Sequence, residues 1–303
     1  MNRKEFGKLL AALRKNRYDE HYRQITQRKL AEQSGLSEHV LGKLERGEKI
    51  SLEPDLLLAL ARSLGLSTRE RREFFLAAIG LNEQDMPASQ PSPAAIFDEL
   101  FDSLTQISLP AFIVDSYDDI VAANHIILSL FEFSEELRKI APNIVGGYNV
   151  LRFVFSERSK FHSLLDQEHE KYLMQSIRFF RAISLPCRAS PYYEYLISAF
   201  KKDRDMARFN HYYHRDMDAY HQDDYYFESE RFTFCHPGLG ELAFYSPSIF
   251  PVATSHGSLY LVAYIPASVV TIQACASLAS RFSPGAMRLA PWPEKEFNLP
   301  LDK

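Results

Sequence analysis

The spacing of apolar residues along residues 1–80 predicts five short helices. In residues 5–17 the apolar positions lie three or four apart, which places them on one helical face. The same spacing recurs in residues 56–64 and 68–79, whose starts carry a proline and a Ser-Thr-Arg-Glu capping pattern. Between them, residues 26–47 predict two short helices joined by a tight turn. The first part of the chain is therefore predicted to be helical throughout.

Residues 26–47 contain a residue suited to end the first helix, one to cap the second helix and an apolar stripe to bury it. Gly35 stands where a chain leaving a helix takes a left-handed conformation, which glycine adopts at little steric cost. Ser37 is a natural N-cap for the following helix. The apolar stripe of that helix consists of Val40, Leu41 and Leu44. Polar side chains remain on its N-terminal half, the part of a recognition helix that reaches base edges in the major groove.

From residue 94 onward the pattern mixes helices and strands. An amphipathic helix over residues 95–106 is followed by strands at 109–115 and 120–123 and by a helix that opens on Asn124. Further helices are expected at 157–182, 192–200 and 203–214, and further strands at 225–235, 241–246 and 258–264. The predicted fold class is mainly α with α+β, in which a five-helix domain precedes a domain with an antiparallel sheet and several helices.

Composition divides the chain into four parts. Residues 81–93 are rich in Pro, Ser and Gln and predict a linker between domains at 1–80 and 94–273. Residues 274–303 contain several prolines and predict a tail, either docked on the domain or disordered. The sequence thus predicts two domains, a linker and a tail.

The net charge of −4 conceals an asymmetry between the two predicted domains. Residues 1–80 hold 16 basic and 11 acidic residues, a net charge of 16 − 11 = +5, so the remainder carries −4 − 5 = −9. A basic small domain is drawn to phosphate and an acidic large one is kept away from it. The three cysteines are isolated, and neither a signal peptide nor a membrane span is visible, so we expect a cytoplasmic protein.

The residues of the turn and its flanks resemble the Xre/phage-repressor class of helix-turn-helix domains, on the basis of Gln27, Leu30-Ala31, Gly35, Ser37, Leu41 and Leu44-Glu45-Arg46-Gly47. The resemblance implies a sequence-specific transcription regulator that binds as a homodimer to a two-fold operator, with half-sites roughly 34 Å apart. The expected DNA-binding residues are Gln27, Arg28, Ser37, Glu38, His39, Lys43 and Arg46.

These residues suit different kinds of contact. Ser37 and Arg46 are expected on phosphates, and Lys43 on guanine or a phosphate. Glu38 could accept from a cytosine amino group or could serve only as a first-turn acid. His39 could donate to guanine N7. Glu45 is expected to tie the helix end to the rest of its domain.

Three later blocks resemble the ligand-binding domain of MmyB-like transcription regulators: residues 110–114 with Ala123-Asn124, residues 149–152 with Phe155, and residues 236–242. The resemblance implies a PAS-like fold and a fatty-acid-like ligand in an apolar pocket. The candidate ligand-binding residues are Asn124, Arg152, His236, Phe112 and Phe155. The first three have alternatives: Asn124 as an N-cap, Arg152 in an ion pair and His236 in shaping a hairpin.

Other functions have weaker support in the sequence. The His211-Tyr-Tyr-His214 sequence with the acidic residues after it could hold a metal or sense pH, although a solvated connector is the favoured interpretation. The sequence contains no Gly-x-Ser-x-Gly nucleophile elbow, no Walker phosphate-binding loop and no GxGxxG dinucleotide-binding motif. We therefore expect that the protein is not an enzyme and that it binds no metal and no cofactor apart from a possible fatty acid. The alternative function is a DNA-tethered module that binds a protein partner or a metal and no lipid.

Overall fold

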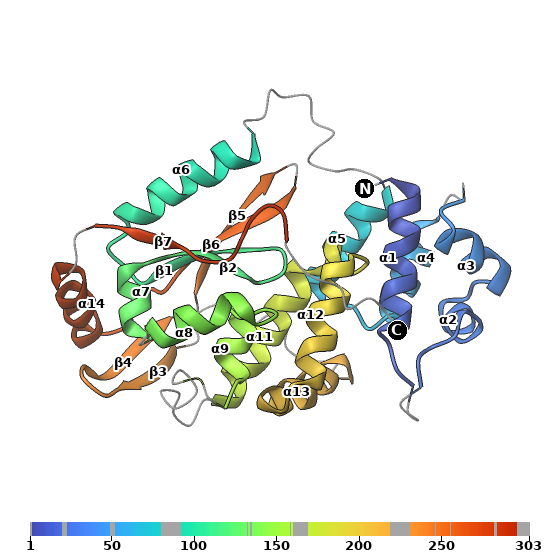
Figure 1. The fold of residues 1–303 in the computed structure, drawn as a ribbon. Coiled ribbons are helices and arrows are strands. Elements are labelled where there is room, and N and C mark those ends of the chain that lie inside the picture. The colour runs from blue at the N-terminus through green and yellow to red at the C-terminus, as the bar shows by residue number, and fades with distance from the viewer. Residues whose placement is uncertain are drawn as a thin grey trace. The chain divides into compact units, whose positions relative to one another are not determined.

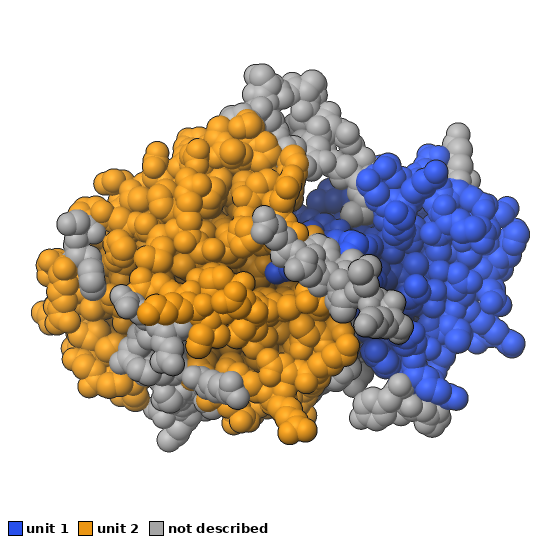
Figure 2. Space-filling model, in the orientation of Figure 1, with its two compact units in different colours: residues 1–87, 181–194, 213–224 blue, residues 88–180, 195–212, 225–303 orange. Residues whose placement is uncertain are grey.

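The protein is described here from a computed structural model, which covers residues 2–19, 23–48, 52–79, 92–131, 133, 135–157, 159, 169–218, 231–245, 247–254, 256–281 and 284–295. It divides into two compact units (Figure 2). Unit 1 comprises residues 1–87, 181–194 and 213–224, and unit 2 comprises residues 88–180, 195–212 and 225–303. The predicted fold class is confirmed: a helical N-terminal part precedes a part built on an antiparallel sheet.

Unit 1 contains the five predicted helices, α1 (Arg3–Lys15), α2 (Gln27–Ser34), α3 (Glu38–Glu45), α4 (Pro54–Ser63) and α5 (Thr68–Ile79). Their caps match the sequence signals. The Thr26 and Ser37 hydroxyls accept from backbone N–H groups at the starts of α2 and α3, and Gly35 ends α2 with φ +71°. The apolar faces of all five helices meet in one core, whose fully buried members include Leu10, Leu30, Leu41 and Leu60.

Two glycines let α3 pack directly on α1. A Cβ on Gly7 would lie 2.5 Å from the Glu45 carbonyl oxygen and 2.6 Å from that of Leu44. A Cβ on Gly47 would lie 2.6 Å from Lys4 Cα, and the φ of Gly47 is +72°, a conformation that favours glycine. The position of the C-terminal end of α3 therefore depends on two residues without side chains.

Unit 1 also includes a segment from far along the chain, residues 181–194. It contains the end of α11 (His169–Ile183), the 3₁₀ turn η3 (Leu185–Cys187) and the start of α12 (Pro191–Lys202). Leu185 is fully buried in the same core as the five N-terminal helices. This segment lies within the predicted 94–273 domain in sequence but groups with the N-terminal helices in space.

Unit 2 is built on a five-stranded antiparallel sheet in the order β5-β6-β1-β2-β7 (Figure 1). Its strands are β1 (Ala111–Asp115), β2 (Ile120–Asn124), β5 (Ser248–Thr254), β6 (Gly257–Ala263) and β7 (Ala286–Arg288). Helix α6 (Pro93–Gln106) covers one face, where Phe97 and Leu104 pack with Ile113. Successive strand residues alternate between faces, so Phe112 points to the opposite side. That side carries the cavity described below.

Further helices, two 3₁₀ turns and a separate hairpin complete unit 2. They are the helices α7 (His125–Leu130), α8 (Glu135–Ile140), α9 (Val150–Phe155), α13 (Ala207–Asp218) and α14 (Val269–Arg281), the 3₁₀ turns η2 (Ala141–Asn143) and η4 (Arg204–Met206), and the hairpin β3 (Arg231–His236) with β4 (Gly240–Tyr245). The last residues of α13 belong to unit 1. No helix in the described ranges has the length and apolar character to cross a bilayer.

Several elements differ from the sequence prediction. The helix expected over 157–182 is observed as α11 from His169, and residues 160–168 lie outside the described residues. Strands β5 and β7 and helix α14 were not predicted. Part of the predicted tail belongs to unit 2, because β7 pairs with β2 and the Trp292 ring lies 5.7 Å from that of Phe97. The predicted linker 81–93 is described only at residues 92 and 93.

Candidate nucleic-acid interface and ligand cavity

The N-terminal half of α3 presents polar side chains to solvent. Ser37, Glu38 and His39 are exposed there, while Leu41 on the opposite face is fully buried. Lys43 lies in the last turn of the helix and is half-buried. Ser37 Oγ accepts from the Val40 N–H at 3.3 Å, so the N-cap role uses one lone pair and leaves the hydroxyl proton for a further acceptor. The exposed set has the donors and acceptors that base edges and phosphates require.

A partly buried ion pair fixes the opposite end of α3. Arg14 of α1 binds Glu45 in a two-pronged arrangement, with Nε 2.6 Å from Oε1 and Nη2 3.0 Å from Oε2. Gln27 Nε2 donates to Glu45 Oε2 at 2.6 Å and ties α2 to the same carboxylate. Glu45 therefore has the structural role that the sequence predicted. The Gln27 amide N–H is engaged inside the unit, and its predicted contact with DNA would have to use other atoms or break this bond.

Arg28 and Arg46 lie in exposed ion pairs. Arg28 Nε is 3.0 Å from Glu32 Oε1, with the two side chains 76% and 63% exposed. Arg46 Nε is 2.7 Å from Glu48 Oε1, with exposures of 58% and 45%. Pairs as exposed as these contribute little to stability. Both arginines can exchange their partner for a phosphate at small cost.

In unit 2, an apolar cavity of about 40 Å³ lies against β1 and β2. Its walls come from both strands, from α7, α9 and α11, and from residues between elements: Phe112, Ile120, Ala123, Ile127, Leu128, Phe131, Phe133, Val150, Phe153, Val154, Tyr172, Tyr264 and Leu289. The hydroxyls in this lining are those of Tyr172 and Tyr264, which lie 3.0 Å apart. Burial raises the pKa of both tyrosines, so both are neutral.

Asn124, a predicted ligand-binding residue, uses its side-chain amide for four hydrogen bonds inside unit 2. Its Oδ1 accepts from the Ile127 N–H at 3.0 Å and from the Ala111 N–H at 3.3 Å. Its Nδ2 donates to the carbonyls of Ile107 and Leu109 at 3.1 and 2.7 Å. Asn124 thus uses its amide to cap α7 and to hold the chain entering β1, which is the alternative role that its position suggested.

Three other ligand candidates also have internal roles, while Phe112 does line the cavity. Arg152 pairs with Asp203 at 2.8 Å and donates to the Val145 carbonyl at 3.1 Å. His236 Nδ1 accepts from the Gly238 N–H at 3.0 Å and shapes the β3–β4 turn. Phe155 packs against Phe209 at 5.9 Å between ring centres and is not among the lining residues of the described cavity. Ligand contacts of these three residues stay predictions beside these internal roles.

The β1–β2 turn carries a buried acidic group that sequence reasoning did not single out. Asp118 is fully buried with φ +63°, and neither carboxyl oxygen has a hydrogen-bond partner in the described part of the chain. Burial, together with the charges of Asp119 and Asp115, raises the pKa of Asp118 well above its usual value. Lys295 forms ion pairs with Asp115 and Asp119 but not, within the described residues, with Asp118.

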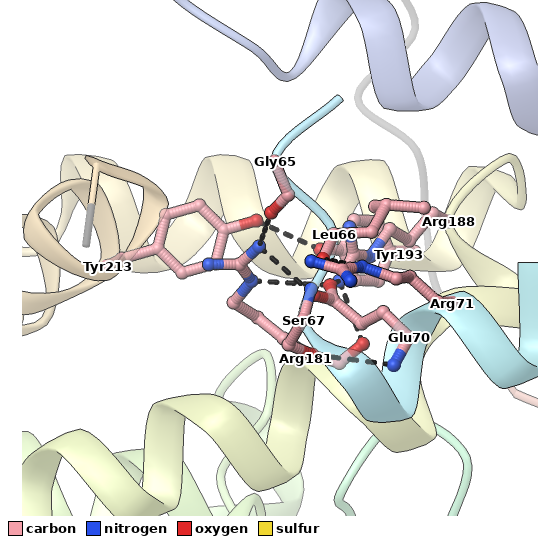
Figure 3. Close-up of polar contacts among 9 residues, drawn as sticks. All are labelled: Gly65, Leu66, Ser67, Glu70, Arg71, Arg181, Arg188, Tyr193 and Tyr213. Carbon is pink, nitrogen blue, oxygen red and sulfur yellow. Dashed lines mark hydrogen bonds and ion pairs between the residues drawn. The ribbon is translucent and has the colours of Figure 1, made fainter. Parts of the chain in front are cut away.

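A second missed group is a buried cluster in unit 1, centred on Glu70 (Figure 3). Glu70 is fully buried, and its carboxylate accepts from the Ser67 N–H at 2.8 Å. Arg181 binds it from Nε at 3.3 Å and Nη2 at 3.2 Å, and Arg188 binds Oε1 through Nη2. Burial favours the neutral acid, but the two guanidinium groups and the Ser67 bonds outweigh it and lower the pKa of Glu70 to about 2.

Little of the predicted metal or pH-sensing region can be described. His211 is exposed, and its ring centre lies 5.3 Å from that of Tyr212. The side chain of His214 and residues 219–230 lie outside the described residues. Among the residues that are described, no group of three or more His, Cys, Asp or Glu side chains is arranged to hold a metal ion.

A five-helix unit with an exposed polar helix face and a sheet domain with an apolar cavity are the arrangement expected of a ligand-sensing, DNA-binding transcription regulator. Comparison with protein families supports this class at both ends of the chain. Residues 5–74 match a helix-turn-helix domain, and residues 95–278 match the ligand-binding domain of MmyB-like transcription regulators. Because the second match covers more than half of the chain, the protein belongs to the MmyB-like transcription regulators. No curated protein matches the chain.

Proposed function

We propose that the protein binds a two-fold operator through α3 and that a small apolar molecule in the unit 2 cavity modulates this binding. The observation that carries the proposal is the exposure of Ser37, Glu38 and His39 on a helix whose other end is fixed by Arg14 and Glu45. A rigidly held helix with a free polar face suits sequence-specific contact with the major groove. A homodimer would place two copies of this face on symmetric half-sites, in the cytoplasm where the DNA lies.

Within the DNA contact, we assign base readout to Glu38, His39 and Lys43. Ser37, Arg28 and Arg46 are assigned to phosphates, which position the helix without reading sequence. Gln27 is assigned to the support of α3 through Glu45, and a DNA contact through its carbonyl oxygen remains compatible with the 2.6 Å bond from its amide nitrogen.

We propose a fatty-acid-like ligand because the cavity lining is apolar apart from the hydroxyls of Tyr172 and Tyr264. These hydroxyls could hold a polar head group while the phenylalanine rings surround a chain. The cavity of about 40 Å³ is far below the roughly 300 Å³ at which ligand sites begin. The lining side chains must therefore move outward when a ligand enters, and this movement supplies the two conformations that a sensor needs.

The experiment has two parts. Duplexes enriched from a random pool by the purified protein should share a two-fold symmetric sequence. Organic extraction of the same protein followed by mass spectrometry should release an acyl chain, or the protein should be stabilised by fatty acids between octanoic and hexadecanoic acid. Failure to enrich any duplex would contradict the DNA-binding part, and protein that is empty and indifferent to every acid would contradict the ligand part.

The small cavity favours one second candidate, a unit 2 that binds a protein partner and no small molecule. An exposed apolar strip on α14, made of Val269, Val270 and Ile272 with exposures of 69%, 58% and 55%, is compatible with such a partner. Under this alternative, fatty acids leave the melting temperature unchanged, while Val270→Lys abolishes association with the partner. Stabilisation by an added fatty acid would exclude it.

A further inference from the structure

The Glu70 cluster holds a distant segment of the chain against the helix-turn-helix unit. Arg181 lies in the last turn of α11 and Arg188 directly follows η3, and both are 3% exposed. Between them, Leu185 is buried in the core of unit 1. Arg181 Nη2 also donates to the Gly65 carbonyl at the end of α4, at 3.2 Å. Residues 181–188 are thus held by two ion pairs and a hydrogen bond to a carbonyl group (Figure 3), and by the burial of Leu185.

The three charges of this attachment are costly to separate. Glu70 carries one negative charge and faces two positive ones, and each of the three side chains is 3% exposed or less. Separating a buried ion pair leaves uncompensated charge in a medium of low dielectric constant, which is costly. The cluster therefore favours a joint movement of α5 with the end of α11, which is the property that a coupling element requires.

Helix α11 also forms part of the cavity wall. Tyr172 lines the cavity and lies on the same uninterrupted helix as Arg181, nine residues earlier, which corresponds to about 14 Å along the axis. The division between the units falls within this helix, after Phe180. A rotation or translation of α11 that accommodates an occupant at Tyr172 is therefore delivered to Arg181.

The contacts within unit 1 continue from Glu70 to the DNA-reading helix. Glu70 lies in the first turn of α5, and Phe74, one turn later, is fully buried with its ring centre 5.3 Å from that of Phe6 on α1. Helix α1 in turn holds α3 through Gly7 and through the Arg14–Glu45 pair. These steps are contacts between helices of unit 1, fully buried at Phe74 and partly buried at the Arg14–Glu45 pair.

We propose that Arg181 and Arg188 are positioning residues that couple the state of the cavity to the geometry of α3, through Glu70 and α5. The inference rests on the proposed function for its DNA readout. It adds the route by which unit 2 acts on DNA binding.

A double-mutant cycle tests this route without knowledge of the ligand. Tyr172→Trp enlarges a cavity-wall ring and stands in for an occupant, and Arg181→Lys keeps the charge but removes the two-pronged contact. Tyr172→Trp should change the affinity for the selected operator by about fivefold or more in the wild-type background and by less than about twofold in Arg181→Lys. In the control background Arg178→Lys, on the same helix but outside the cluster, the full change should persist.

If Arg181 had only a structural role, Arg181→Lys would lower operator affinity by the same factor whether residue 172 is Tyr or Trp. Equal fold-changes in both backgrounds, or no change from Tyr172→Trp alone, would overturn the proposal. Should Arg181→Lys fail to fold, Glu70→Gln takes its place in the cycle. Amide hydrogen exchange gives a readout that needs no DNA: Tyr172→Trp should alter exchange in residues 68–79 of the otherwise native protein. Unchanged exchange there would refute the coupling, even if DNA binding itself is confirmed.

Discussion

At the scale of single residues, the DNA contact depends most on Lys43, the half-buried cation on the exposed side of α3. Lys43→Ala should weaken operator binding by about 1–3 kcal/mol if the ammonium reaches a guanine. If the ammonium reaches a phosphate, the slope of log affinity against log salt should fall by about 1. Fluorescence anisotropy over a salt series measures both quantities. Lys139→Ala, an exposed lysine on α8, is the matched control, and equal affinity of the two variants would contradict the assignment.

The Glu70 carboxylate makes stability depend on pH in a defined direction. Its pKa is about 2 in the folded protein against 4.5 for a free side chain, so the folded state favours the ionised form. The stabilisation is complete above pH 4.5 and is lost as the pH falls from 4.5 toward 2. Glu70→Gln should therefore cost about 3–5 kcal/mol at neutral pH, and less at about pH 3. Urea unfolding of both proteins at the two pH values measures this, and a pH-independent difference would contradict it.

Asp118 should have the opposite effect. Because burial raises the pKa of its carboxyl, the folded protein retains the proton to higher pH than the unfolded chain does. Stability therefore falls as the pH rises from the normal aspartate range toward the raised pKa. Asp118→Asn removes this penalty, and asparagine also tolerates the observed φ of +63°. We expect a gain of about 1–3 kcal/mol at neutral pH in urea unfolding. A loss of stability would show that the carboxyl has a favourable partner.

The polar ligand candidates show what a sequence reveals about a site and what it does not. Asn124, Arg152 and His236 stand out because polar residues are conspicuous in apolar surroundings, but each serves the protein itself. Glu70 is visible in sequence as half of a capping box with Ser67, and that box forms. Its pairing with residues 111 and 118 positions later depends on tertiary packing, which no local pattern encodes.

At the scale of elements, the close packing of α3 against α1 depends on Gly7. A Cβ at this position would approach two α3 carbonyl oxygens to within 2.5 and 2.6 Å, which forces the helices apart. Gly7→Ala should therefore destabilise the protein by about 1–3 kcal/mol and weaken operator binding, despite the better helix propensity of alanine. Thermal unfolding and anisotropy measure these effects. Lys8→Ala, at the exposed neighbour, should change neither stability nor affinity if the packing explanation is correct.

The helices of unit 1 and the first hairpin of unit 2 were predictable because each has a strong local signal. Caps at Thr26 and Ser37 and the left-handed Gly35 define α2 and α3, and two apolar runs around a turn define β1 and β2. Strand β5 lacks such a signal, since it is an edge strand that contains Pro251 and exposes Phe250 by 55%. Strand β7 has three residues and depends on its neighbour β2.

At the scale of the whole molecule, the units defined by packing do not follow the two family matches. Residues 181–194 lie within the ligand-binding family match at 95–278 but pack in unit 1. Helices α11, α12 and α13 each contribute residues to both units. Continuous helices therefore belong to both units, and the connection between the units is not limited to the segment before α6.

The most direct test of the account is the affinity of the wild-type protein for its selected operator, measured by anisotropy with and without a saturating fatty acid that binds it. The account predicts that the two dissociation constants differ by about fivefold or more, and that Lys43→Ala weakens both. Equal dissociation constants with and without a bound acid would contradict the claim that the cavity of unit 2 controls DNA binding by α3.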